Sequence, residues 1–312
     1  MLMSLISLCI PYSLIAFAGM CLGISLCGLA GNGVVMWFLG FHTKQSPFTV
    51  YILNLAVADF SLLLLFLLLI LAFLVEAAFC TSLFPFIHHY SYFVFAVGLL
   101  CHLFDLSSLG LLAALSTERC LSVLCPIWYR CHRPRHLSGI VSGALWALAG
   151  VFVSSLYITY TYTEDSEIVL AGVALTISMV FSLMMLISNL LLFLKLRCGS
   201  RRRQPGKLFV AILLNVLLFF AFDNVIFIIV LFTLLLVLCN FLQQLGYIPV
   251  PTQVVFLLNC INSSIKPFIY FVAGRCWSPC SMESLRLSLH RVFEEEEENP
   301  ADSDDANTDT LI

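Results

Sequence analysis

The sequence has little charge: Asp, Glu, Lys and Arg make up 11% of its 312 residues, while 61% are hydrophobic. A soluble domain carries about 25% charged residues, because it must cover its core with a polar surface. This chain has too much apolar surface for a globule in water, and its mean hydropathy is +1.02. The composition therefore predicts a membrane protein. The formal net charge of −3 gives no basis for nucleic-acid binding.

Basic residues are absent from alternate connections of the chain. A membrane-crossing helix needs roughly 20 mostly apolar residues. Seven stretches qualify, at about 13–40, 48–76, 86–119, 138–160, 168–195, 208–237 and 250–273. The gaps after the second, fourth and sixth stretches contain no Lys or Arg, and of the 15 basic residues only Lys266 lies well inside a stretch. Because basic loops stay in the cytoplasm, the pattern places the N-terminus outside and the C-terminus inside.

These features predict an all-α, multi-pass membrane protein, a bundle of seven transmembrane helices. Its parts are an extracellular N-terminus (1–12), the bundle (13–275), an amphipathic helix on the inner membrane surface (276–293) and an acidic, disordered cytoplasmic tail (294–312). Cys276 and Cys280 at the start of the amphipathic helix are either palmitoylation sites or reduced cysteines.

Metal-binding cysteine pairs and internal repeats are also missing. The 13 cysteines include no Cys-x-x-Cys spacing, so no metal or cofactor is expected. Most lie within spans or on the cytosolic side, where thiols stay reduced. Cys80 and Cys239 lie near the predicted outer surface and could pair, but spacing alone does not decide this. The absence of a repeat weakens a transporter built from inverted repeats.

Several short motifs stand at fixed places in the spans. They are Gly31-Asn32 in the first, Leu55-Ala56-Val57-Ala58-Asp59 in the second, Glu118-Arg119-Cys120 ending the third, Trp146 in the fourth and Lys266-Pro267-Phe268-Ile269-Tyr270 in the seventh. With seven spans, they resemble the rhodopsin-like G-protein-coupled receptors. The stretch 116–138 is similar to the Mas-related receptors almost residue for residue, and 47–51 and 262–264 also resemble that family.

The resemblance implies a plasma-membrane receptor, not an enzyme, that couples an extracellular ligand to a heterotrimeric G protein. It also implies an activation switch and G-protein contact formed by Glu118, Arg119, Cys120, Pro126, Pro267 and Tyr270. The alternative for Arg119 is a side chain that only reaches the membrane interface. Arrestin and membrane lipids are further expected partners. The C-terminal Thr310-Leu311-Ile312 fits a PDZ-domain ligand.

A polar cluster is expected inside the bundle. Its candidate members are Asn32, Asp59, Ser108, Asn262, Ser263 and Lys266. In related receptors the matching residues can hold a sodium ion. Here Lys266 replaces the usual Asn of the seventh-span motif, and the 3.6-residue helical repeat puts it on one face with Asn262 and Ser263. We expect Lys266 to pair with Asp59 and to displace sodium; the alternative is a lysine that reaches interfacial water.

Two acids lie in the outer halves of the predicted spans. Asp105 precedes Arg119 by about 21 Å along a helix, and Asp223 lies about 24 Å above Lys207, at 1.5 Å per residue. Acids at such depth indicate a functional site. The candidate contacts for a cationic ligand are Asp105, Asp223, Glu164, Asp165 and Tyr157. The alternative is that the two acids bond to polar neighbours, that the loop acids are solvated charge, and that Tyr157 anchors its helix at the outer membrane interface.

One departure from the family concerns the sixth span, where Phe222-Asp223-Asn224 stands in place of the usual proline. A kink there needs another cause. A receptor-like protein that no longer signals is therefore an alternative. A transporter is a more distant one, because intramembrane charges can also mark a substrate path.

Overall fold

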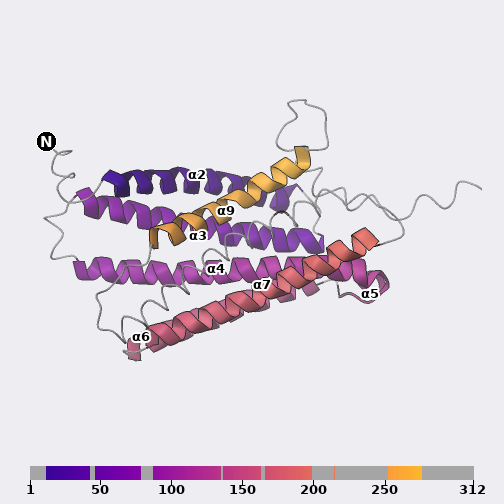
Figure 1. Cartoon of the computed structure of the whole chain (residues 1–312). Helices are drawn as coiled ribbons and strands as arrows, with labels where there is room; N and C mark the ends of the chain where they lie inside the picture. Colours follow the sequence, from indigo (N-terminus) through magenta and orange to yellow (C-terminus); the bar gives the residue numbers. More distant parts are fainter. Residues whose placement is uncertain are drawn as a thin grey trace, which may run out of the picture.

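The computed structural model describes residues 12–42, 46–78, 87–134, 136–162, 166–198 and 252–275, together with Leu214. In these ranges the regular structure is helical. The helices are α2 (Tyr12–Phe41), α3 (Pro47–Ala78), α4 (Ile87–Leu124), α5 (Pro126–Cys131), α6 (Leu137–Tyr162), α7 (Ser166–Cys198) and α9 (Thr252–Arg275). Figure 1 shows the long helices lying side by side, with the short α5 at one end of the bundle.

The long helices match the predicted spans. Helices α2, α3, α4, α6, α7 and α9 correspond to spans one to five and seven. Four of them contain stretches long and apolar enough to cross a bilayer, namely Ile15–Phe41, Pro47–Val75, Tyr92–Leu124 and Leu137–Ile158, and α7 contains the shorter apolar stretch Thr176–Leu192. Apart from Leu214, the predicted sixth span lies outside the described residues, as do the surface helix at 276–293 and the tail at 294–312.

The third span differs from its predicted bounds. Helix α4 continues past Arg119 to Leu124, and the short α5 follows it immediately. The residues after Arg119 are compatible with a helix, and the first residue that disfavours its continuation is Pro126, which restricts Cys125 before it. Pro126 then takes the first position of α5, where its missing N–H is not needed. One connection that spacing predicted as a loop therefore contains a helix.

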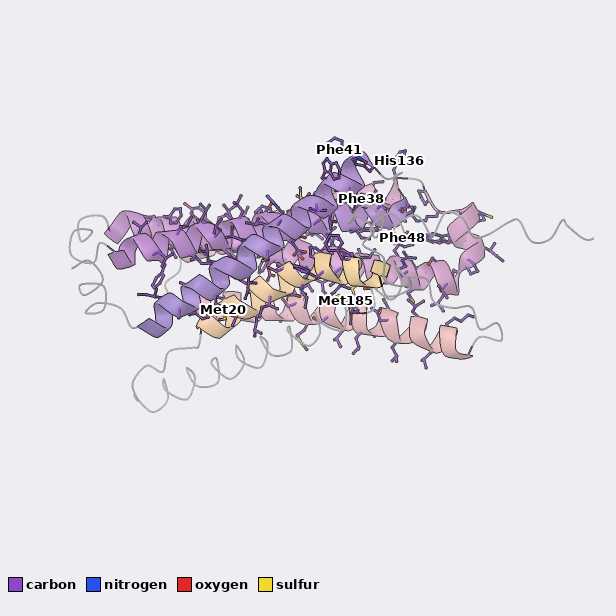
Figure 2. The ribbon with its side chains drawn as sticks, turned by 90° about the horizontal axis from the view of Figure 1, so that it is seen from above. Met20, Phe38, Phe41, Phe48, His136 and Met185 are labelled. Carbon is purple, nitrogen blue, oxygen red and sulfur yellow. The ribbon has the colours of Figure 1, made fainter. Side chains whose placement is uncertain are left out.

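Helix α4 is central in the described part of the bundle. It packs against α3, α5, α6 and α7, while α9 packs against α2 and α3. The largest buried cluster joins Phe38 of α2, Tyr51 of α3, Leu112 of α4, Met185 of α7 and Tyr270 of α9. In Figure 2, Phe41, Phe48 and His136 lie toward one end of the bundle, and Met20 lies toward the other end of α2. Large apolar residues also cover the outer surface, as in a bundle surrounded by hydrocarbon.

The start of α3 is held by its own sequence. The backbone N–H of Ser46 donates to the Thr49 hydroxyl at 2.8 Å, and the backbone N–H of Thr49 lies 3.3 Å from the Ser46 hydroxyl. This reciprocal cap satisfies two N–H groups that a helix start leaves free. Pro47 takes the first helical position. The cap thereby holds Phe48, the next residue, at the end of the bundle where α5 lies.

Helices α2 and α9 approach closely at Gly28. A Cβ atom added there would overlap the Ser264 side chain and lie 2.7 Å from the Cδ1 atom of Leu63. One turn further, a Cβ on Gly31 would lie 3.0 Å from Pro267. The Ser264 hydroxyl uses this proximity to donate to the backbone carbonyl of Ile24 at 3.1 Å. Small residues at helix contacts allow such packing in membranes.

We predict that Gly28→Ala destabilises the protein, because the added methyl group has no room between α2, α3 and α9. Overpacking of this kind costs about 1–3 kcal/mol. The measurement is the thermal unfolding midpoint of the detergent-solubilised chain. The matched control is Gly19→Ala on the same helix, where an added Cβ meets nothing within 4 Å. Equal midpoints for the two variants would contradict the close approach at Gly28.

Candidate functional site

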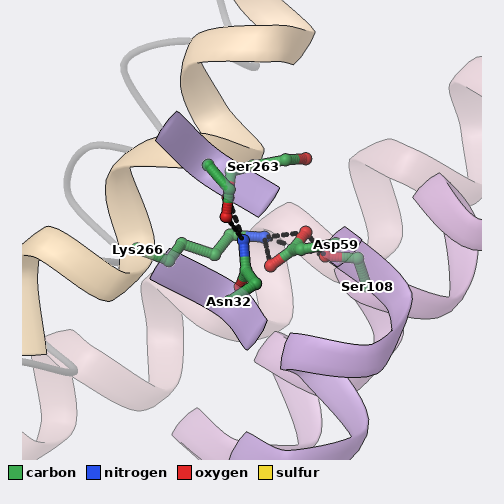
Figure 3. A network of polar contacts seen from close by, with 6 residues as sticks. Asn32, Asp59, Ser108, Ser263 and Lys266 are labelled. Carbon is green, nitrogen blue, oxygen red and sulfur yellow. Dashed lines mark hydrogen bonds and ion pairs between the residues drawn. The ribbon is translucent and has the colours of Figure 1, made fainter. Parts of the chain in front are cut away.

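A buried ion pair lies in the middle of the bundle. The Lys266 ammonium on α9 donates to both carboxylate oxygens of Asp59 on α3, at 2.8 and 2.9 Å. It also donates to the Ser108 hydroxyl on α4 at 2.8 Å, and that hydroxyl donates to Asp59 Oδ1 at 3.0 Å. The Lys266 and Asp59 side chains are 3% and 1% exposed. Figure 3 shows the three side chains converging from three helices.

Asn32 extends this network to α2. Its side-chain amide donates to the backbone carbonyl of Gly28 at 3.0 Å. It also donates to the backbone carbonyl of Ser263 at 3.1 Å, as Figure 3 shows. The second bond joins α2 to α9 one turn before Lys266. Asn262 is also buried, at 7% exposure. The Lys266–Asp59 pairing expected from the sequence is present. Five residues of the predicted cluster lie together: Asn32, Asp59, Ser108, Ser263 and Lys266.

These residues do not fit a bound sodium ion. A sodium site needs an uncompensated carboxylate and oxygen ligands free to face the ion. Here the Lys266 ammonium neutralises Asp59 and is the hydrogen-bond donor to the oxygens of Asp59 and Ser108. A second cation at this place would meet the positive charge of Lys266 at close range. The chain therefore supplies its own cation to the polar cluster.

A second buried ion pair lies at the end of the bundle that carries α5. Glu118 near the end of α4 accepts a bond from Nε of Arg133, which lies between α5 and α6. The Tyr51 hydroxyl on α3 lies 3.4 Å from the other Glu118 oxygen. The Nη2 atom of Arg133 donates to the Ser138 hydroxyl at 2.6 Å. Among the described residues, Glu118 is thus paired with a loop arginine and not with its chain neighbour Arg119.

Arg119 lies against an aromatic stack. Its guanidinium carbon is 3.6 Å from the centre of the Phe48 ring, which is cation–π distance. The Phe48 ring stacks on Tyr129 of α5 with centroids 6.2 Å apart. Arg119 is only 7% exposed. Burial, with the negative charge of Glu118 as the next cause, raises the pKa of Tyr129, so its phenol is neutral at physiological pH.

The structure also describes the other predicted switch residues. Tyr270 belongs to the large buried cluster at 3% exposure, and Cys120 is buried at 5%. Pro126 begins α5. Pro267 stands inside α9, where it removes a backbone donor one residue after Lys266. These positions make a conformational role for the residues physically reasonable, and that role remains a proposal.

The predicted ligand contacts are only partly described. Asp105 is exposed on α4, as is His102 one turn before it. Tyr157 on α6 is 53% exposed, and its ring lies 6.4 Å from that of Phe95 on α4. Asp223, Glu164 and Asp165 lie outside the described residues, as do the palmitoylation candidates Cys276 and Cys280.

Sequence reasoning did not place in the site five residues that surround Glu118 and Arg119. They are Phe48, Tyr51, Tyr129, Arg133 and Ser138. Arg133 follows Glu118 by 15 residues, with the end of α4, the short helix α5 and a turn between them. Helical periodicity cannot predict a contact across such a turn. The signal that could have found it is the pairing rule, because a buried acid requires a nearby cation.

Comparison with known proteins agrees with this geometry. Residues 31–270 match the family model described as "7 transmembrane receptor (rhodopsin family)". The chain is 33% identical to "Proto-oncogene Mas" of Homo sapiens over 298 residues, which cover 93% of this chain and 87% of the relative. It is 36% identical to "Mas-related G-protein coupled receptor member D" of Rattus norvegicus, with 88% and 84% covered. For "Mas-related G-protein coupled receptor member X1" of Rattus norvegicus the identity is 34%, with 90% and 85% covered.

The family match covers all four residues of the two ion pairs, Asp59, Glu118, Arg133 and Lys266. The relatives exceed 30% identity over most of their own length. The chain therefore belongs to the Mas-related G-protein-coupled receptors, within the rhodopsin family of seven-transmembrane receptors.

Proposed function

We propose that this receptor lies in the plasma membrane and converts the binding of an extracellular cationic ligand, a basic peptide or an amine, into activation of a heterotrimeric G protein. The ligand half of the proposal depends on Asp105. The effector half depends on Arg119 at the opposite end of the same helix α4.

The observation that carries the proposal is the exposure of Asp105. Asp105 lies on a helix that crosses the membrane, yet its side chain is exposed. A carboxylate at that depth is costly in hydrocarbon, so it belongs at a water-filled opening within the bundle. No basic residue occurs in the predicted outer loops. A cation approaching from outside would therefore meet an attractive field and a carboxylate at the end of its path.

The test is G-protein activation in cells that express the chain, screened against basic peptides and amines. We expect a response to a cationic compound that Asp105→Asn weakens about tenfold or more, because a charged contact of about 1.5–3 kcal/mol is lost. Arg119→Ala should abolish the response but leave ligand binding detectable, because Arg119 lies at the far end of α4 from Asp105. Surface expression is measured for every variant.

The matched control acts on the ligand. An N-acetylated form of the active amine has the same shape without the charge, and it should be weak on the unmodified receptor and unaffected by Asp105→Asn. A full response from both variants at equal surface expression would contradict the proposal. A well-expressed chain that never activates a G protein would favour the receptor-like protein that does not signal.

We further propose that the Lys266 ammonium takes the role that a sodium ion has in related receptors. Its three oxygen contacts support this, because they join α3, α4 and α9 through one internal cation. Unlike an ion, the ammonium is covalently attached and cannot leave. The resting state of the cluster should therefore be independent of salt composition.

We predict that agonist affinity is unchanged when sodium is replaced by N-methylglucamine at constant ionic strength. Lys266→Asn should create sodium dependence, because it removes the internal cation and adds an oxygen ligand. The matched control, Lys266→Met, removes the charge but adds no oxygen, and it should gain less sodium dependence. Strong sodium sensitivity in the unmodified receptor, abolished by Asp59→Asn, would disprove the replacement.

The same ion pair predicts a stability pattern. Lys266→Met alone leaves Asp59 buried without its cation, which costs about 3–5 kcal/mol. Adding Asp59→Asn removes the uncompensated charge, so the double variant should be more stable than Lys266→Met. The measurement is the thermal unfolding midpoint in detergent for both single variants and the double variant. Additive losses would show that the two side chains do not act as a pair.

A further inference from the structure

The Arg133 side chain is buried although the residue lies between two spans, where the side chain could extend into water. Its side chain is 6% exposed, and that of Glu118 is 7% exposed. The Nε and Nη2 atoms bond Glu118 of α4 and Ser138 in the first turn of α6, while Nη1 lies 3.4 Å from the Pro134 carbonyl. A buried charge is retained only where it is paired and hydrogen-bonded. One planar guanidinium therefore joins the connection between α5 and α6 to two transmembrane helices.

The same side chain closes a ring of contacts around Arg119. The Arg133 guanidinium lies 5.2 Å from the Tyr129 ring, and Tyr129 stacks on Phe48. Phe48 lies under the Arg119 guanidinium, and Arg119 is the chain neighbour of Glu118, to which Arg133 is bonded. The order is Glu118, Arg133, Tyr129, Phe48, Arg119 and back to Glu118. Every link but the peptide bond is non-covalent, so loss of one contact loosens the others.

We propose that Arg133 is a positioning residue that holds Arg119 in the resting conformation. Its bonds to Glu118 and Ser138 seat α5, so that Tyr129 supports Phe48 beneath Arg119. Release of Arg133 from Glu118 removes this aromatic support. The inference rests on the proposed G-protein coupling, which requires Arg119 to become available to the G protein.

The ring explains why an arginine and not a lysine suits this position. The guanidinium has donors in a fixed fork and a flat face. The fork spans Glu118 and Ser138, and the face lies over Tyr129. A lysine at this place keeps the charge for Glu118 but lacks the planar fork, so Arg133→Lys should keep only part of the restraint.

The first experiment measures agonist-independent G-protein activation. Arg133→Met and Glu118→Gln should each raise it about tenfold, a shift that loss of one buried ion pair can give a two-state equilibrium. The double variant should show no more activity than the higher single variant, because both changes break the same pair. Arg133→Lys should be intermediate. Arg135→Met, which removes a positive charge from the same loop, is the control and should leave the basal level unchanged.

A residue that only stabilised the fold would behave differently. Its loss would lower surface expression, basal signalling and agonist response together. The inference would be overturned if Arg133→Met left the basal activity per surface receptor unchanged. It would also be overturned if the rise in basal activity in the double variant were the product of the rises in the two single variants. If Arg133→Met does not reach the surface, Arg133→Lys decides in its place, and an unchanged basal level in that variant overturns the inference.

A second measurement needs no G protein and so separates this inference from the proposed function. Cys120, next to Arg119, is 5% exposed, whereas Cys125 and Cys131 are exposed. A water-soluble maleimide, read by peptide mass spectrometry, should label Cys120 several-fold faster in Arg133→Met than in the unmodified chain. Cys125 and Cys131 are the internal references. Equal labelling of Cys120 overturns the inference; faster labelling in a chain that activates no G protein supports the ring and contradicts the coupling.

Discussion

The described bundle depends on an ion pair that is buried away from water. Asp59 and Lys266 are almost fully buried, and each would be strongly destabilising without the other. The pair is satisfied only when α3, α4 and α9 are in register, because Ser108 completes the contacts. Hydrocarbon alone packs helices with little specificity, since lipid tails are as apolar as leucine. The ion pair supplies the specificity that apolar packing lacks.

Helix α4 contributes to both polar clusters. Ser108 belongs to the central cluster, and Glu118 and Arg119 belong to the ring around Arg119; Ser108 and Glu118 are ten residues or about 15 Å apart along the helix. Asp105 lies one turn before Ser108, on the side of the proposed ligand. A shift of α4 along its axis would therefore disturb the proposed ligand contact, the Lys266 contacts and the Glu118 pair in one movement. Two-state elements of this kind can couple distant sites without a continuous path of side chains.

The sequence predicted the parts of this arrangement that helical geometry controls. Apolar length located the spans, and the 3.6-residue repeat put Lys266 on the face with Asn262 and Ser263, from which pairing with Asp59 was expected. The sequence analysis did not predict that α4 continues to Leu124. It also did not predict α5, because the six residues of this helix are too few to show a clear periodicity. The Arg133–Glu118 contact depends on how that short helix turns the chain back. Two residues 15 apart on either side of such a turn have no fixed geometric relation until the turn is known.

The two ion pairs differ in what can open them. Asp59 lies within the apolar stretch Pro47–Val75, and Lys266 is buried beside it on α9, so separating them would leave two buried charges without partners. Arg133 lies on a connection beyond the predicted spans, so after release its guanidinium can be hydrated at once. The cost of opening is then mainly that of the buried Glu118, to which the Tyr51 hydroxyl lies close. The Lys266–Asp59 pair is thus suited to hold the helices in register through a conformational change. The Arg133–Glu118 pair is suited to break during that change.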